Sequence, residues 1–225
     1  HQFPSMETID MHAVMVPAKE VGGDLYDYFI KDDKLYFAIG DVSGKGVPAS
    51  LFMAITRAAF RIVASTGLTP CDIVRKMNKA VSDGNETGMF VTMFVGCLDL
   101  KTKELQYCNA GHNPIVIVDP RLNARFLEVK PNLVAGVTMD FTFEQQSCML
   151  EAGSRIILYT DGVTEAERAD KEQYGNERLL AWAANTKLYH GAKEACEGLL
   201  NVVKDFVKGN EQNDDITIMT IKLKK

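Results

Sequence analysis

The stretch LYFAIGDVSGKGVPA (residues 35–49) places a strand, an acidic turn and a helix start next to one another. Leu35–Ile39 is an apolar run typical of a buried strand, and Pro48 suits the first turn of a helix. Between them, Asp41 opens a loop with two glycines, and a glycine-rich loop that enters a helix can bind phosphate. The loop lacks the G-x-x-x-x-G-K-[ST] spacing, so it is not a Walker P-loop.

Outward from this stretch, the apolar patterns predict about ten strands and four helices, the helices in two pairs. Short turns link most strands, which favours antiparallel sheets over βαβ winding. We therefore expect an α+β fold, a central antiparallel β-sandwich flanked by helices on both faces. Helices are expected over residues 48–65, 69–82 (with Thr69 as N-cap), 177–184 and 192–207. Strands are expected over residues 10–17, 25–30, 35–39, 90–98, 104–109, 114–118, 124–129, 141–149, 155–159 and 216–223.

Length and composition indicate one domain over residues 1–225, because 46% of the 225 residues are hydrophobic and can bury a full core. The net charge is −5 and no Lys/Arg block is present, which argues against nucleic acid as a partner. Five cysteines without a C-x-x-C pair argue against a disulfide framework or a thiolate zinc site, and each is interpreted as a small buried residue. A reducing cytosol fits this cysteine usage.

Membrane signals are absent from the sequence pattern, since we find neither a run of 18 apolar residues nor a signal peptide. We therefore expect no membrane contact by this domain. The chain opens at His1 rather than Met. We interpret it as a fragment, with the C-terminal part of a longer regulatory or sensor protein as one reading.

Aspartates recur at the ends of predicted strands, which is the strongest chemical signal in the chain. Several carboxylates in one small volume repel each other unless cations neutralise them, and hard oxygen ligands suit Mg²⁺ or Mn²⁺ rather than zinc. Taken singly, each is better explained as an ordinary turn or cap residue. The four candidates are Asp24, Asp41, Asp161 and Asp214.

Five sequence blocks, in this order, resemble the stage II sporulation protein E-type branch of the bacterial metal-dependent phosphatases, which are relatives of protein phosphatase 2C. The resemblance covers nearly the whole chain and implies that family's fold, a β-sandwich flanked by helices. The eukaryotic-type enzymes hold the substrate phosphate with an arginine near the N-terminal strand, and no arginine precedes Arg57 here, as is general in this branch. The blocks are residues 17–27 (PAKEVGGDLYD), 40–49 (GDVSGKGVPA), 109–114 (NAGHNP), 159–165 (YTDGVTE) and 213–217 (NDDIT).

The resemblance implies metal ligands for two divalent cations, Mn²⁺ or Mg²⁺. Asp41 would bridge the ions and the main-chain carbonyl of Val42 would bind one of them. Asp161 and Asp214 would complete the second metal site, and Asp24 would hold the first ion directly or through water. Asp214 is favoured as the ligand, with Asp215 as its neighbour.

Three further residues are assigned by the same resemblance. His112 could be a general acid, but a loop-positioning role is favoured, because it lies on a turn between two strands. Thr164 and Glu165 are expected to orient the metal site from behind the ligands.

The implied activity is hydrolysis of phosphoserine or phosphothreonine on a regulatory protein by a metal-activated water. The implied substrate is an anti-sigma-factor antagonist (an anti-anti-sigma factor) in a bacterial partner-switching pathway, in the cytoplasm. We hypothesise that the helices over residues 48–65 and 69–82 regulate the site, because they follow directly from Asp41. The oligomeric state is left open, a homodimer being one option.

Two rival functions stay open at this point. A catalytically silent pseudophosphatase would bind phosphoproteins, although none of the four aspartates is missing. A two-metal phosphohydrolase with a small-molecule substrate would use the same site, although no nucleotide-reading motif is present.

Overall fold

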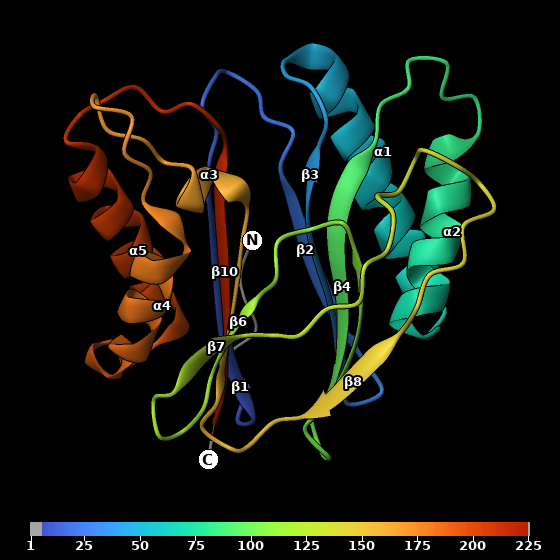
Figure 1. Ribbon diagram of the computed structural model, residues 1–225. Coiled ribbons are helices and arrows are strands. Elements are labelled where there is room, and N and C mark those ends of the chain that lie inside the picture. Colours follow the sequence, from blue (N-terminus) through green and yellow to red (C-terminus); the bar gives the residue numbers. More distant parts are fainter. Residues whose placement is uncertain (1–5, 225) are drawn as a thin grey trace. The chain divides into compact units, whose positions relative to one another are not determined.

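The computed structural model describes residues 6–224 and divides into two compact units, each built on one five-stranded antiparallel sheet. In the described chain, unit 1 comprises residues 6–18, 114–127 and 150–224. Unit 2 comprises residues 19–113 and 128–149. Both have helices beside a sheet, so the predicted α+β class is confirmed (Figure 1).

Unit 1 contains the sheet with strand order β1-β10-β9-β6-β7. Its core lies between this sheet and α4 and α5, where the fully buried strand β9 contributes Tyr159 and α5 contributes Leu199. In Figure 1, α4 and α5 lie beside the strands of this sheet. The elements are β1 (Ile9–Val16), β6 (Val116–Val118), β7 (Ala124–Phe126), β9 (Arg155–Tyr159), α3 (Asp161–Thr164), α4 (Gly175–Ala184), the 3₁₀ helix η1 (Thr186–Leu188), α5 (Ala192–Val207) and β10 (Ile216–Leu223).

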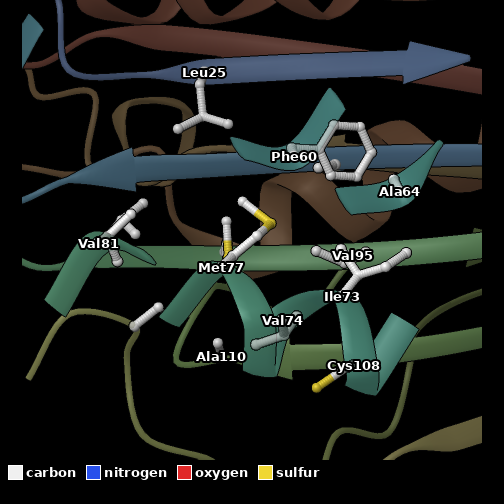
Figure 2. Packing of buried hydrophobic residues seen from close by; sticks show 14 of the residues in the cluster. Leu25, Phe60, Ala64, Ile73, Val74, Met77, Val81, Val95, Cys108 and Ala110 are labelled. Carbon is white, nitrogen blue, oxygen red and sulfur yellow. The ribbon is translucent and has the colours of Figure 1, made fainter. Parts of the chain in front are cut away.

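Unit 2 contains the sheet with strand order β2-β3-β4-β5-β8 and two helices that pack on it. The helix α2 begins as predicted, because the Thr69 hydroxyl accepts a hydrogen bond from the amide of Asp72. Figure 2 shows the apolar face of α2, with Ile73 and Met77, packed toward the strands. The elements are β2 (Leu25–Lys31), β3 (Lys34–Val42), α1 (Val47–Ala64), α2 (Pro70–Ser82), β4 (Val91–Asp99), β5 (Glu104–Ala110) and β8 (Gln146–Met149).

The helix α1 is apolar on more than one face. Phe60 and Ala64 are fully buried against the sheet, whereas Leu51, Ile55 and Ile62 are 57–71% exposed. Among the described residues, α1 alone has the length and composition of a membrane-spanning helix. Its helical spacing was predicted correctly, but Leu51, Ile55 and Ile62 do not face the core.

A buried carboxylate fastens α1 to the edge strand β2. The Asp27 side chain has no solvent exposure and accepts hydrogen bonds from two arginines of α1. Arg61 binds both of its oxygens at 2.6 Å, and Arg57 binds one at 3.2 Å. Such a bidentate pair fixes orientation as well as distance, so α1 is held in one position along β2.

Three sequence predictions need correction. Residues 141–145 form a loop rather than the start of a strand, because Phe143 is buried in the core beside α2 instead of pairing in the sheet. The one-turn helix α3 was not predicted, so the described chain has five α-helices rather than four. Among the cysteines, Cys148 is partly exposed, while the other four are buried.

Substitution of Asp27 by asparagine tests the attachment of α1. We expect the free energy of unfolding to fall by about 2–4 kcal/mol, because two guanidinium groups lose their carboxylate while the amide stays buried. Thermal or urea unfolding measures the change. Arg75→Met, which removes an exposed ion pair with Asp72, is the control and should cost less than about 1 kcal/mol. Equal effects of the two substitutions would contradict this role of Asp27.

Candidate metal centre

Strand pairing in unit 2 brings Asp24 and Asp41 together. Leu25 pairs with Gly40, so the next step of the same antiparallel register sets Asp24 opposite Asp41. The amide of Val42 donates to the Gly23 carbonyl at 3.4 Å, which shows that the pairing extends past the end of β2. Asp24 is only 2% exposed, whereas Asp41 is half-buried. Directly opposite like charges are destabilising unless a cation lies between them.

The glycines before Asp24 permit this close approach. A Cβ atom added to Gly23 would lie 3.1 Å from the Val42 carbonyl oxygen and 3.6 Å from Oδ1 of Asp41. The Ser50 hydroxyl, in the first turn of α1, donates to the Gly22 carbonyl at 2.8 Å. The acidic turn, the glycine pair and the start of α1 are therefore in direct contact.

A buried polar cluster supports the main chain of Asp41 from the neighbouring strand. Thr92 pairs with Asp41, and its hydroxyl lies 3.4 Å from the Asp41 carbonyl oxygen and 3.0 Å from Nδ1 of His112. His112 is 6% exposed, and its carbonyl accepts a hydrogen bond from Asn109 at 2.8 Å. The structure thus connects His112 to the main chain of Asp41 through the hydroxyl of Thr92.

In unit 1, Asp161 follows β9 and begins α3. Thr160 before it is fully buried and is bonded to β10 through its amide and its hydroxyl, both to Thr217. A Cβ atom on Gly162 would lie 2.0 Å from the carbonyl oxygen of Asp215. Only glycine permits this contact, so the T-D-G turn lies directly against the second acidic pair.

The two adjacent aspartates of unit 1 have different surroundings. Asp215 is 8% exposed, and its Oδ1 accepts a hydrogen bond from the Ala18 amide at 2.8 Å. Asp214 is half-buried, and its Oδ1 accepts from the amide of Asp215 at 2.9 Å. Asp215 therefore holds the chain end of β1 in place, whereas Asp214 keeps more of its carboxylate open to solvent.

The other two predicted residues of this turn bind its main chain. The Thr164 hydroxyl donates to the Asp161 carbonyl at 3.2 Å, and the Glu165 amide donates to the same oxygen at 2.7 Å. The Glu165 side chain is exposed. Both residues therefore stabilise the one-turn helix α3 that presents Asp161.

The donor atoms of both units suit a hard divalent cation. Each unit brings two acidic segments together, and unit 2 adds the main-chain oxygen of Val42. Such carboxylate and carbonyl oxygens are the ligands that Mg²⁺ and Mn²⁺ prefer. In residues 6–224, however, no three His, Cys, Asp or Glu side chains are grouped closely enough to form a metal site. The types of donor atom nevertheless fit these ions.

Sequence reasoning missed the residues that support the acidic turns. Thr92 lies inside a strand and Ser50 inside a helix, where neither has a motif to mark it. Their roles follow from strand register and helix packing, which are long-range properties. Thr160 entered the sequence prediction only as one residue of the YTDGVTE block. The hydrogen bond that its hydroxyl accepts from the Thr217 amide of β10 was not predicted.

Comparison with proteins of known structure identifies the class of fold. The structure resembles the RsbU and RsbW domains of a Mycobacterium tuberculosis protein, with a TM-score of 0.85 and 28% identity over 96% of this chain and 60% of that chain. It also resembles the catalytic domain of the serine threonine protein phosphatase PstP, solved with two manganese ions, with a TM-score of 0.68 and 13% identity over 97% and 100% of the two chains. The fold is therefore that of the PP2C-like phosphatase domains, as predicted.

The family follows from the sequence matches. The family model described as stage II sporulation protein E (SpoIIE) matches residues 31–224. Phosphoserine phosphatase RsbU of Bacillus subtilis is 32% identical over 99% of this chain and 66% of its own length. The chain belongs to the stage II sporulation protein E family. It spans slightly less than two thirds of RsbU.

Single substitutions should separate the two neighbouring aspartates by stability. We expect Asp215→Ala to lower the free energy of unfolding by about 1–3 kcal/mol, because the Ala18 amide loses a buried acceptor. Asp214→Ala should cost less than about 1 kcal/mol, because its half-buried carboxylate is more easily replaced by water. Urea unfolding in EDTA measures both without metal effects. The reverse order would contradict the assigned roles.

Proposed function

We propose that this chain is a metal-dependent serine/threonine phosphoprotein phosphatase that hydrolyses phosphoserine or phosphothreonine on a regulatory protein. The observation that carries this proposal is the placement of acidic turns at strand ends in both units, on the fold of a phosphatase family. Membership of that family and the named activity of RsbU support it.

We infer that Asp24, Asp41, Asp161 and Asp214 are the carboxylate ligands of two divalent cations, Mn²⁺ or Mg²⁺, with the Val42 carbonyl as a further ligand. The close approach of Asp24 to Asp41 supports the first pair, and the contact of Gly162 with Asp215 supports the position of Asp161 beside Asp214. The manganese ions of the structurally similar PstP domain are consistent with this ligand chemistry. Asp214 is preferred to Asp215, whose carboxylate is buried against the Ala18 amide.

When bound to these residues, two such ions would supply a water with a lowered pKa and would offset the negative charge of the phosphoryl oxygens. The protein side chains contribute the rest. Thr92 and His112 hold the main chain of Asp41, so that its carboxylate keeps one position. Gly44 and Gly46 have positive φ angles and open space beside them, so a phosphate group can approach the main chain of this loop closely.

We propose a cytoplasmic location in a bacterium and a partner-switching pathway, with an anti-sigma-factor antagonist as the substrate. The similarity to RsbU and to a structure that joins RsbU and RsbW domains supports this context. Five free cysteines fit a reducing compartment. We further infer that α1 is a regulatory element, because it contacts the Gly22–Asp24 turn through Ser50 and is fixed to β2 through Asp27.

Hydrolysis of a phosphoserine peptide with Mn²⁺, with Mg²⁺ and with EDTA tests the proposal. We expect activity only with a divalent cation. Asp41→Asn and Asp161→Asn should each lower kcat/KM by about 100-fold or more, because each removes a charged ligand.

Asp205→Asn, an exposed aspartate of α5, is the matched control and should keep wild-type activity. Turnover that persists in EDTA, or that survives both ligand substitutions, would contradict the proposal. Faster hydrolysis of nucleotides than of phosphoserine peptides would instead favour a small-molecule phosphohydrolase.

A further inference from the structure

Unit 1 contains a cavity at the start of β9, whereas Asp161 follows the other end of that strand. Its volume is about 150 Å³, several times the roughly 30 Å³ that one water molecule occupies in the liquid. Strand β9, the 118–122 turn, the segment after α4 and the end of β10 form its walls. The charged or titratable residues that line it are Asp119, Arg155, Lys187, Tyr189, His190 and Lys222.

Arg155 is an unusual wall residue, because it is a buried cation without a direct ion pair, and the carboxylates of Asp10 and Glu194 act on it only from a greater distance. It is 5% exposed, and in the described chain it forms no ion pair with any carboxylate. Its Nη2 donates to the Tyr189 carbonyl at 2.9 Å, and its Nη1 has no hydrogen-bond partner. Burial lowers the pKa of the guanidinium. Buried charges are normally paired, so this one favours an anion nearby.

Strand pairing places a second positive charge beside Arg155. Arg155 lies directly opposite Lys222 in the β9–β10 ladder, and like charges in that position are destabilising. Asp10 is opposite Lys222 on the other side, but its Oδ2 accepts the Ala192 amide at 2.7 Å, at the start of α5. The Lys222 amino group instead donates to the His190 carbonyl at 2.7 Å.

The single carboxylate that lines the cavity already accepts hydrogen bonds within its own turn. Asp119 accepts hydrogen bonds from the main-chain amides of Arg121 and Asn123 and from the Asn123 side chain, which together lower its pKa. Asp119 therefore stays negatively charged and hydrogen-bonded to its own turn. With three cationic side chains and one anion, the lining has a formal charge of +2, in a chain whose net charge is −5.

We propose that this cavity is a binding site for a small phosphate dianion, either free or carried on a small molecule. The formal charge of the lining is equal in size and opposite in sign to that of a phosphate dianion. Arginine and lysine are the residues that bind phosphate oxygens. The carbonyl contacts of Arg155 and Lys222 hold the two cations at the cavity and use only part of their donor capacity. The site uses none of the aspartates of the candidate metal centre.

Titration with inorganic phosphate in EDTA, at about pH 8 where phosphate is a dianion, tests this site without metal at the acidic turns. Calorimetry gives the affinity. Thermal unfolding should show a rise in the midpoint of roughly 3 °C at ten times the dissociation constant. Lys222→Gln and Lys187→Gln should each weaken binding by about fivefold or more, and added salt should weaken it further.

Lys204→Gln, an exposed lysine of α5 in the same unit, carries the same charge change and should bind as the wild type does. The proposal is overturned if phosphate does not bind, or if the cavity variants bind it as well as the wild type. Equal affinity for acetate at matched ionic strength would also overturn it, because a monovalent anion would then suffice. A comparison of phosphate with glycerol phosphate distinguishes a free ion from a phosphate monoester.

Discussion

The antiparallel pairing of β2 with β3 is the constraint on which the candidate metal centre depends. It sets Asp24, one residue before β2 begins, opposite Asp41, one residue before β3 ends. Two carboxylates in this position repel each other, and the folded chain pays for their approach unless a cation is bound. Gly23 makes the approach sterically feasible, and the bond between its carbonyl and the Val42 amide fixes it. The chemistry of the site thus originates in sheet register.

The same strand carries a second carboxylate with the opposite role. Asp27, three residues after Asp24, is satisfied by Arg57 and Arg61 and needs no cation from solution. It fixes α1, whose first turn contacts the glycine pair through Ser50. One short segment therefore combines a proposed metal ligand with the attachment of the helix that follows the acidic loop. A displacement of α1 along β2 would act on both.

Local patterns were sufficient for most elements but not for their orientation. Helix α2 was predicted with its N-cap, because Thr69 before Pro70 is a local signal. For α1, apolar residues surround the helix, so periodicity predicted a helix but not that Leu51 would be exposed. The candidate aspartates were predicted from their position at strand ends, and their role as ligands stays a prediction. Thr92 was not predicted, because its contact with Asp41 depends on the pairing of β3 with β4.

Calorimetric titration of the chain with Mn²⁺ tests the central claim, that the aspartates at these strand ends are ligands of divalent cations. Two Mn²⁺ ions should bind per chain. Asp41→Asn and Asp161→Asn should each raise the dissociation constant for Mn²⁺ by about tenfold or more, because each removes one charged ligand. In EDTA neither variant should unfold more readily than the wild type, and Asp41→Asn should be at least as stable, because it removes the repulsion between Asp24 and Asp41. The absence of Mn²⁺ binding, or unchanged affinity in both variants, would contradict the account.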